Sequence, residues 1–146
     1  VSNINIHFNE GMCKSLLNEL RFTIGEQYEL NEFNLKSIES TFSNGLEYEN
    51  YQYVKDDLKT IFGLNLVSNV ILQYNGDILS RFVYTLDSKD LTSLVNRINN
   101  YLTEGKKLTL ERMPTSVILE FYKTYKIQLS IEVDNRVFLK VCKISG

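Results

Sequence analysis

The sequence predicts an α+β fold: one domain over residues 1–146, with an antiparallel sheet of about five strands, including two hairpins, packed against helices. Three observations lead to this class. Segments rich in β-branched and aromatic residues occur in two hairpin patterns, and a strong amphipathic helical stripe lies between them. Strands and helices also form separate runs instead of strict βαβ alternation. A chain of 146 residues suits a single domain.

The first third is expected to contain one strand and several helices. Residues 3–8 predict the strand, and apolar residues in 12–20 predict a helix after it. A second helix is predicted over 35–42, where Leu, Ile and Phe repeat at helical spacing. Residues 46–54 leave two alternatives open: an edge strand, or the start of a helix that runs to Gly63. The apolar spacing favours the helix.

Residues 67–74 and 78–86 predict a β-hairpin, because both are rich in β-branched and aromatic residues and Asn75-Gly76 lies between them. Asn-Gly is a strong hairpin signal, since both central residues of a type I′ turn need a positive φ. The register stays open, because neither a two-residue nor a three-residue loop aligns the apolar faces.

A helix is expected to follow this hairpin. Asp87 can cap its first N–H groups, and Asp90 lies near the positive end of the helix dipole. Gly105 is expected to end the helix, since glycine adopts the left-handed conformation without cost. Six apolar residues share one helix face: Leu91, Leu94, Val95, Ile98, Tyr101 and Leu102.

The C-terminal part is expected to add a short strand at 107–111, a helix opening at Pro114, and a second hairpin. The helix is predicted from an apolar stripe: Ile118, Phe121, Tyr122 and Tyr125. In the hairpin, residues 127–133 alternate strictly between apolar and polar. A three-residue loop would pair Val133 with Val137 and place the apolar rows of both strands on one face.

The residues that catalysis usually needs are scarce. His7 is the only histidine, and with Cys13 and Cys142 it falls short of a four-ligand zinc site. No glycine-rich phosphate loop and no EF-hand spacing occurs. We therefore expect no enzyme, no catalytic residue, no metal site and no cofactor. Two cysteines suit reduced thiols in the cytosol, and neither a membrane-crossing apolar run nor a signal peptide is expected.

Charge is concentrated in one segment. Residues 26–57 hold eight carboxylates against two lysines, with four tyrosines among them. Such a surface can steer a basic partner by its field and anchor it with rigid amphipathic rings. The predicted partner-binding residues are Glu47, Tyr48, Glu49, Tyr51, Tyr53, Asp56 and Asp57.

These features predict a protein-binding inhibitor, most plausibly an immunity protein or antitoxin that neutralises a basic, nuclease-type toxin. Nucleic-acid binding is less expected, because residues 1–100 carry 13 acids against 8 bases, whereas 101–146 carry 5 against 8. The alternative is a nucleic-acid module that uses the basic C-terminal hairpin, where Phe138 could stack between Arg136 and Lys140. A homodimeric regulatory subunit is a further alternative, and no membrane partner is expected.

Overall fold

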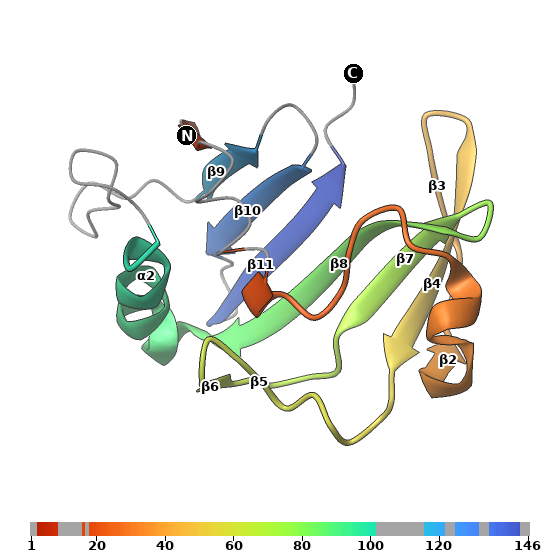
Figure 1. Ribbon diagram of the computed structural model, residues 1–146, viewed down its shortest axis with the longest axis horizontal. Helices are drawn as coiled ribbons and strands as arrows, with labels where there is room; N and C mark the ends of the chain where they lie inside the picture. Colours follow the sequence, from red (N-terminus) through yellow and green to blue (C-terminus); the bar gives the residue numbers. More distant parts are fainter. Residues whose placement is uncertain are drawn as a thin grey trace.

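The computed structural model describes residues 3–8, 16, 18–101, 116–121, 125–131 and 135–143. Its main strands are β1 Asn3–Phe8, β2 Leu35–Ser37, β3 Thr41–Ser43, β4 Leu46–Tyr53, β7 Ile71–Asn75, β8 Ile78–Asp87, β9 Ser116–Phe121, β10 Tyr125–Ile131 and β11 Arg136–Lys143. They form one sheet in the order β1-β9-β10-β11-β8-β7-β4-β2, with β3 beside β2 on the free side of β4 (Figure 1). All pairs are antiparallel except β1 with β9.

The remaining elements are short. A two-stranded hairpin joins β5 Thr60–Ile61 to β6 Leu64–Asn65. The helices are α2 Leu91–Asn99 and the 3-10 turns η1 Tyr28–Leu30, η2 Glu32–Asn34 and η3 Ser88–Asp90. Helical backbone also occurs at Leu16, Asn18 and Glu19.

The predicted α+β class is therefore wrong, since one large, mostly antiparallel sheet with a short helix is closer to an all-β fold. Three expected helical segments are strands. Residues 35–42 form β2 and β3, residues 46–53 form β4 instead of opening a helix, and residues 116–121 form β9. The sequence of residues 116–121 also fits a strand, because the apolar residues Val117, Leu119 and Phe121 occupy every second position.

The β7–β8 hairpin is confirmed, but its turn is one residue later than expected. Gly76 and Asp77 are the central pair, with φ of 56° and 64°, as a type I′ turn requires. A β-bulge explains the ambiguous register: Gln73 pairs with Arg81, yet Tyr74 pairs with Leu79, so Ser80 is the extra residue. The bulge lets both strands keep their apolar side chains on one face.

The second hairpin is confirmed with a register that differs from the prediction by two residues. Val137 pairs with Ile131 and not with Val133. A shift of two preserves the side-chain face, so Leu129 and Leu139 lie opposite each other and both are buried.

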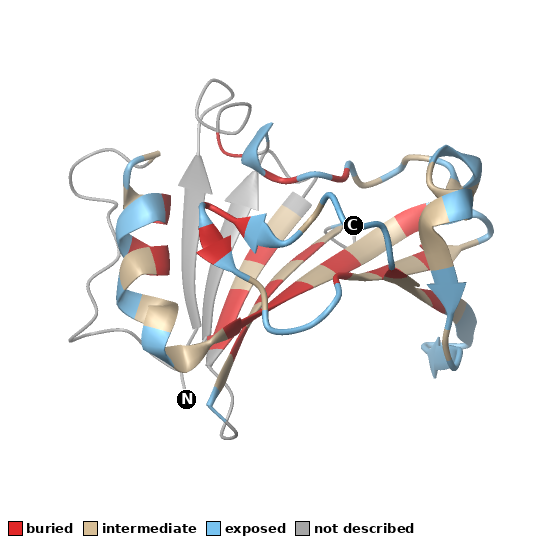
Figure 2. Cartoon of the chain, turned by 90° about the horizontal axis from the view of Figure 1, so that it is seen from below, coloured by how far each residue is buried: buried red, intermediate tan, exposed pale blue. Residues whose placement is uncertain are grey.

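One face of the sheet is covered and forms the core. The covering elements are the segment 16–35, the β5–β6 hairpin and α2, which lie on one side of the sheet in Figure 2. The helix buries Leu94, Val95 and Ile98, as its stripe predicted. The Asp87 carboxylate accepts the Lys89 N–H at 2.9 Å, which confirms the cap, although it caps η3. The expected helix end at Gly105 and the strand at 107–111 lie outside the described residues.

We call the opposite side of the sheet the outer face. Strand alternation places polar and charged residues there: Asn50, Gln52, Gln73, Arg81, Lys126, Arg136, Lys140 and Cys142. Most of these side chains are half-buried, as expected on the solvent-facing side of an antiparallel sheet. Cys142 is a free thiol on this face, and Cys13 lies outside the described residues.

Candidate functional site

The seven predicted binding residues divide between the two ends of β4. Glu47 and Glu49 lie near its start, beside the turn to β3, whereas Asp56 and Asp57 lie in a turn beyond its end. A strand rises about 3.3 Å per residue, so Glu47 and Tyr53 are about 20 Å apart. The structure therefore does not bring the seven together as one surface.

The tyrosines of β4 are mostly part of the core. Tyr53 is 3% exposed and packs edge-on against Phe22, with ring centroids 5.2 Å apart. Tyr51 is half-buried between Tyr28 and Tyr74. Tyr48 is half-buried on the other face of the strand. The buried ring of Tyr53 cannot anchor a partner, and the ring of Tyr51 is partly covered by Tyr28 and Tyr74, so neither is a strong anchor.

Their hydroxyl groups serve local contacts. Tyr51 donates to Glu49 Oε2 at 2.9 Å, and Tyr53 donates to Asp57 Oδ1 at 3.1 Å. Burial, followed by these hydrogen bonds, raises the pKa of both phenols. Both rings therefore stay neutral, and the sequence's alternation of acids and tyrosines reflects internal hydrogen bonding.

Asp57 is paired inside the molecule. Arg21 Nη2 donates to its Oδ2 at 2.5 Å, and Lys55 Nζ lies 3.6 Å from the same oxygen. The Arg21 hydrogen bond is the largest cause that holds the pKa of Asp57 below its ordinary value of 3.8. Asp56 pairs with Lys59 at 3.3 Å. These cations offset the negative field of the turn, which makes it a weak site for a basic partner.

We expect Asp57→Asn to lower stability at neutral pH but not in acid. A carboxylate with a depressed folded-state pKa contributes stability above its unfolded-state pKa, and this contribution is lost as pH falls through the folded-state pKa. Urea unfolding of the parent and of Asp57→Asn, measured from pH 7 to below about pH 4, should therefore give different free energies of unfolding at neutral pH. The two values should converge in acid. Asp56→Asn, at an almost fully exposed side chain, is the control and should follow the parent throughout. A gap that persists in acid would contradict the assigned ion pair.

Several large apolar side chains are exposed at the sheet edge formed by β2, β3 and the turns before them. They were not among the binding residues predicted from the sequence. Phe33 is 93% exposed, Phe42 is 75% and Leu30 is 68%, and Leu46 is also exposed. Carboxylates lie around them along the same elements. We call this elongated border of the sheet the acidic edge. It runs along β4 from Phe33, beside the strand's end, to Phe42, opposite Glu47 near its start, a distance of about 23 Å. Its members are Glu29, Leu30, Glu32, Phe33, Glu39, Phe42, Leu46, Glu47 and Glu49.

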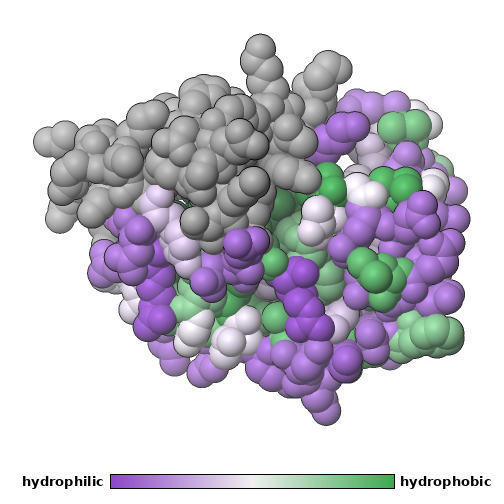
Figure 3. All heavy atoms as spheres, viewed as in Figure 1, coloured by the Kyte–Doolittle hydropathy of each residue, from purple (hydrophilic) through white to green (hydrophobic). Residues whose placement is uncertain are grey.

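The acidic edge has a mixed surface. In Figure 3, isolated apolar side chains stand among hydrophilic ones on the side of the molecule that carries η1, η2 and β2. The register places Phe42 directly opposite Glu47. Within the described residues, no ion pair engages any carboxylate of the acidic edge. An exposed ring beside an unpaired carboxylate is a suitable anchor for a cationic surface.

Hydrogen bonds hold the edge in place. The buried Asn50 donates through Nδ2 to the Glu39 carbonyl at 2.9 Å, and its Oδ1 accepts from Gln73 Nε2 at 3.0 Å. These bonds fix the bend between β2 and β3 on the central strands. The Tyr28 N–H donates to the Asp77 carbonyl at 2.8 Å, which ties η1 to the β7–β8 turn. The exposed rings therefore project from an ordered frame.

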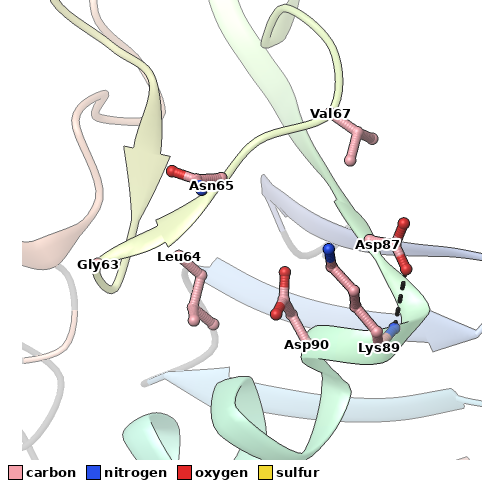
Figure 4. A pocket seen from close by; sticks show the side chains of 7 residues that line it. All are labelled: Gly63, Leu64, Asn65, Val67, Asp87, Lys89 and Asp90. Carbon is pink, nitrogen blue, oxygen red and sulfur yellow. Dashed lines mark hydrogen bonds between the residues drawn. The ribbon is translucent and has the colours of Figure 1, made fainter.

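A pocket lies between the β5–β6 hairpin and the start of α2. This pocket of about 230 Å³ is lined by Gly63, Leu64, Asn65, Val67, Asp87, Lys89 and Asp90 (Figure 4). Asp87 already accepts the Lys89 N–H, and no nucleophile with an adjacent base lines the pocket. In the part of the chain that the structure describes, no group of three His, Cys, Asp or Glu side chains could hold a metal ion. No described helix has the length and apolar character to cross a membrane.

Resemblance to other proteins adds no assignment to either feature, so function has to be argued from the contacts of these residues. Comparison of the chain with protein-family models, with curated proteins and with solved structures finds no match.

Proposed function

We propose that this chain is a non-enzymatic binding protein that captures a basic protein partner through the acidic edge. The observation that carries the proposal is the exposure of Phe33 and Phe42 among carboxylates that have no ion-pair partner within the described residues. Exposed phenylalanine rings provide apolar area that a partner can bury. The surrounding negative charge selects a cationic partner.

The two kinds of residue would act at different stages of binding. Carboxylates at Glu29, Glu39 and Glu47 are exposed and would accelerate encounter with a positive surface. The rings of Phe33 and Phe42 would lose water in the complex and slow its dissociation. This division keeps the acidic segment from the sequence hypothesis but replaces its tyrosine anchors with phenylalanines.

A nuclease-type toxin is one class of partner with the required chemistry. Such a protein carries a basic cleft that grips phosphate groups, and an acidic edge with protruding rings can occupy this cleft. Binding there would compete with nucleic acid and would make the chain an inhibitor, as an immunity protein or antitoxin is. A cytosolic location remains a prediction from the sequence.

The proposal is tested with variants matched in charge. The parent, Glu47→Lys and Asp56→Lys proteins are immobilised and used to capture proteins from the native extract at low salt. We expect a basic partner bound by the parent and by Asp56→Lys, with its association rate reduced about tenfold by Glu47→Lys. Both residues are exposed, but only Glu47 lies on the acidic edge. Equal capture by all three proteins would overturn the proposal.

If a partner is captured, its nuclease activity is measured with and without the parent chain. Inhibition by the parent that is weakened in Glu47→Lys would support the inhibitor role. Capture of the partner with unchanged nuclease activity would leave binding in place and reject the toxin class.

A further inference from the structure

We propose that the outer face of the sheet binds single-stranded nucleic acid through a cluster of cations on β8, β10 and β11, with Phe138 as a stacking platform. This site is separate from the acidic edge, because the cations lie on β8, β10 and β11, whereas the edge lies on β4 and the elements beyond it. It combines residues that are far apart in the sequence. Only the sheet register brings Arg81 next to the C-terminal hairpin.

The register places three cations around one position. Cys142 lies opposite Arg81 on one side and opposite Lys126 on the other, and Lys140 precedes it by two residues on the same face. Neighbouring strands are about 4.8 Å apart, so Arg81 and Lys126 are separated by about 10 Å. Burial raises the pKa of the Cys142 thiol, and the charges of Lys126, Arg81 and Lys140 each lower it, as expected for cations that surround it.

These charges are available for a ligand. Within the described residues, no ion pair involves Arg81, Lys126 or Lys140. In the register, Asp87 is opposite Arg136 and Glu120 is opposite Lys126, so Arg81 and Lys140 are the cations of the cluster with no acid directly opposite them. The positive cluster therefore persists in a chain whose net charge is −2. Attraction would be short-ranged and sensitive to salt.

Phe138 supplies an aromatic surface beside the cations. It is half-buried, and Lys140 Nζ lies 5.6 Å from its ring centroid. Its cross-strand neighbours are small, with Thr85 on one side and Ser130 on the other. Both neighbours are buried, so a base would stack on the exposed part of the Phe138 ring. A base stacked on an aromatic side chain contributes substantially to single-strand binding whatever its identity.

The row that contains Arg81 continues into amide side chains. Gln73 is opposite Arg81, and Asn50 is opposite Gln73, so polar groups extend from the cations toward β4. The segments that cover the core lie on the other side of the sheet, which leaves this face open among the described residues (Figure 2). The amides of Gln73 and Asn50 bond to each other and lie outside the proposed site. An open sheet with cations and an aromatic ring matches single strands better than a duplex, whose bases are stacked inside and cannot reach Phe138.

The test uses the full chain and a short, fluorescein-labelled oligouridylate, with binding followed by fluorescence anisotropy over a series of salt concentrations. Three phosphate contacts on a single strand predict a slope of log K against log salt of about −2. Lys140→Glu should weaken binding by at least about tenfold and make the slope less negative by about 0.7. Lys59→Glu, the same change at an exposed lysine away from the outer face, is the matched control and should bind as the parent does.

Phe138→Leu separates stacking from charge. It keeps an apolar side chain at a half-buried site, and we expect binding to fall by about five- to tenfold with the salt slope unchanged. Thermal unfolding of each variant checks the fold. If Arg81→Glu or Lys140→Glu does not fold, Arg81→Gln and Lys140→Gln remove the charges with less disruption and should each weaken binding.

Three results would overturn the proposal. The first is oligouridylate binding that does not change in Lys140→Glu or its glutamine variant. The second is that a duplex of the same length binds as tightly as the single strand and that Phe138→Leu has no effect on binding. The outer face would then bind any polyanion. The third is self-association that Arg81→Glu and Glu47→Lys both abolish in the absence of nucleic acid binding. In that case the outer face would bind the acidic edge of a second copy.

Discussion

Replacing Phe82 with alanine should lower the free energy of unfolding by about 3–5 kcal/mol, the usual range for a buried phenylalanine. Phe82 is 1% exposed and lies in the middle of β8. Its ring meets Phe22 at 5.5 Å and Tyr84 at 5.8 Å between centroids, both edge-on. Across the strands it faces Leu72 and Val141. The cavity would therefore open where the sheet, the covering segment and the C-terminal hairpin meet.

The neighbouring residue provides the control. Val83 follows Phe82 on the same strand but points to the outer face and is half-buried. Val83→Ala should cost well below half of the Phe82→Ala effect, since less apolar area leaves contact and no enclosed cavity forms. Urea unfolding of both variants measures the difference. Equal losses of unfolding free energy in the two variants would contradict the packing described here, in which only one face of β8 lies in the core.

The parts of the fold that the sequence predicted correctly are those with a local signal. Helix α2 shows its apolar stripe within a few turns, and the Asp87 side chain caps the 3-10 turn η3 that leads directly into it. The two hairpins show turn residues between alternating strands. In each case the interacting residues are close in the sequence, so period and turn chemistry suffice.

The elements that were predicted incorrectly pair with strands that are remote in the sequence or are too short to have a local signal. β9 pairs in parallel with β1, more than a hundred residues earlier, and this pairing leaves no mark on 116–121 itself. β2 and β3 are three residues each and take their conformation from β4. The helical spacing in 35–42 therefore did not decide the structure, because tertiary pairing overrides local preference in such short segments.

The candidate site shows the same limit. The concentration of carboxylates was visible in the sequence, but which aromatic rings accompany them at the surface was not. Tyrosine was expected at the surface because a rigid, amphipathic ring among carboxylates suits the anchor of a binding face. In the structure the Tyr53 hydroxyl donates to Asp57 and the Tyr84 hydroxyl accepts the Arg21 N–H at 3.2 Å, so both rings are buried with their polar ends satisfied. The helical spacing of Leu35, Ile38 and Phe42 gives no warning that Phe42 is exposed.

Phe33→Ala and Phe42→Ala should each speed dissociation of the basic partner by about 10- to 100-fold, as truncation of an aromatic anchor typically does. Neither change should alter the free energy of unfolding by more than about 0.5 kcal/mol, because both rings are largely exposed in the free chain. Val67→Ala, at another exposed apolar residue that lines the pocket away from the acidic edge, should leave both quantities unchanged. Surface plasmon resonance and urea unfolding measure the two effects separately.

The salt dependence of the binding rates distinguishes the role of the phenylalanine rings from that of the carboxylates. Loss of a ring should raise the dissociation rate to a similar extent at low and at high salt, because burial of apolar area is not screened. Reversal of Glu47 should instead slow association mainly at low salt, where the field of the acidic edge extends furthest. A dissociation rate that Phe33→Ala and Phe42→Ala leave unchanged would show that the exposed rings stay outside the complex, and the partner would then be held by charge alone.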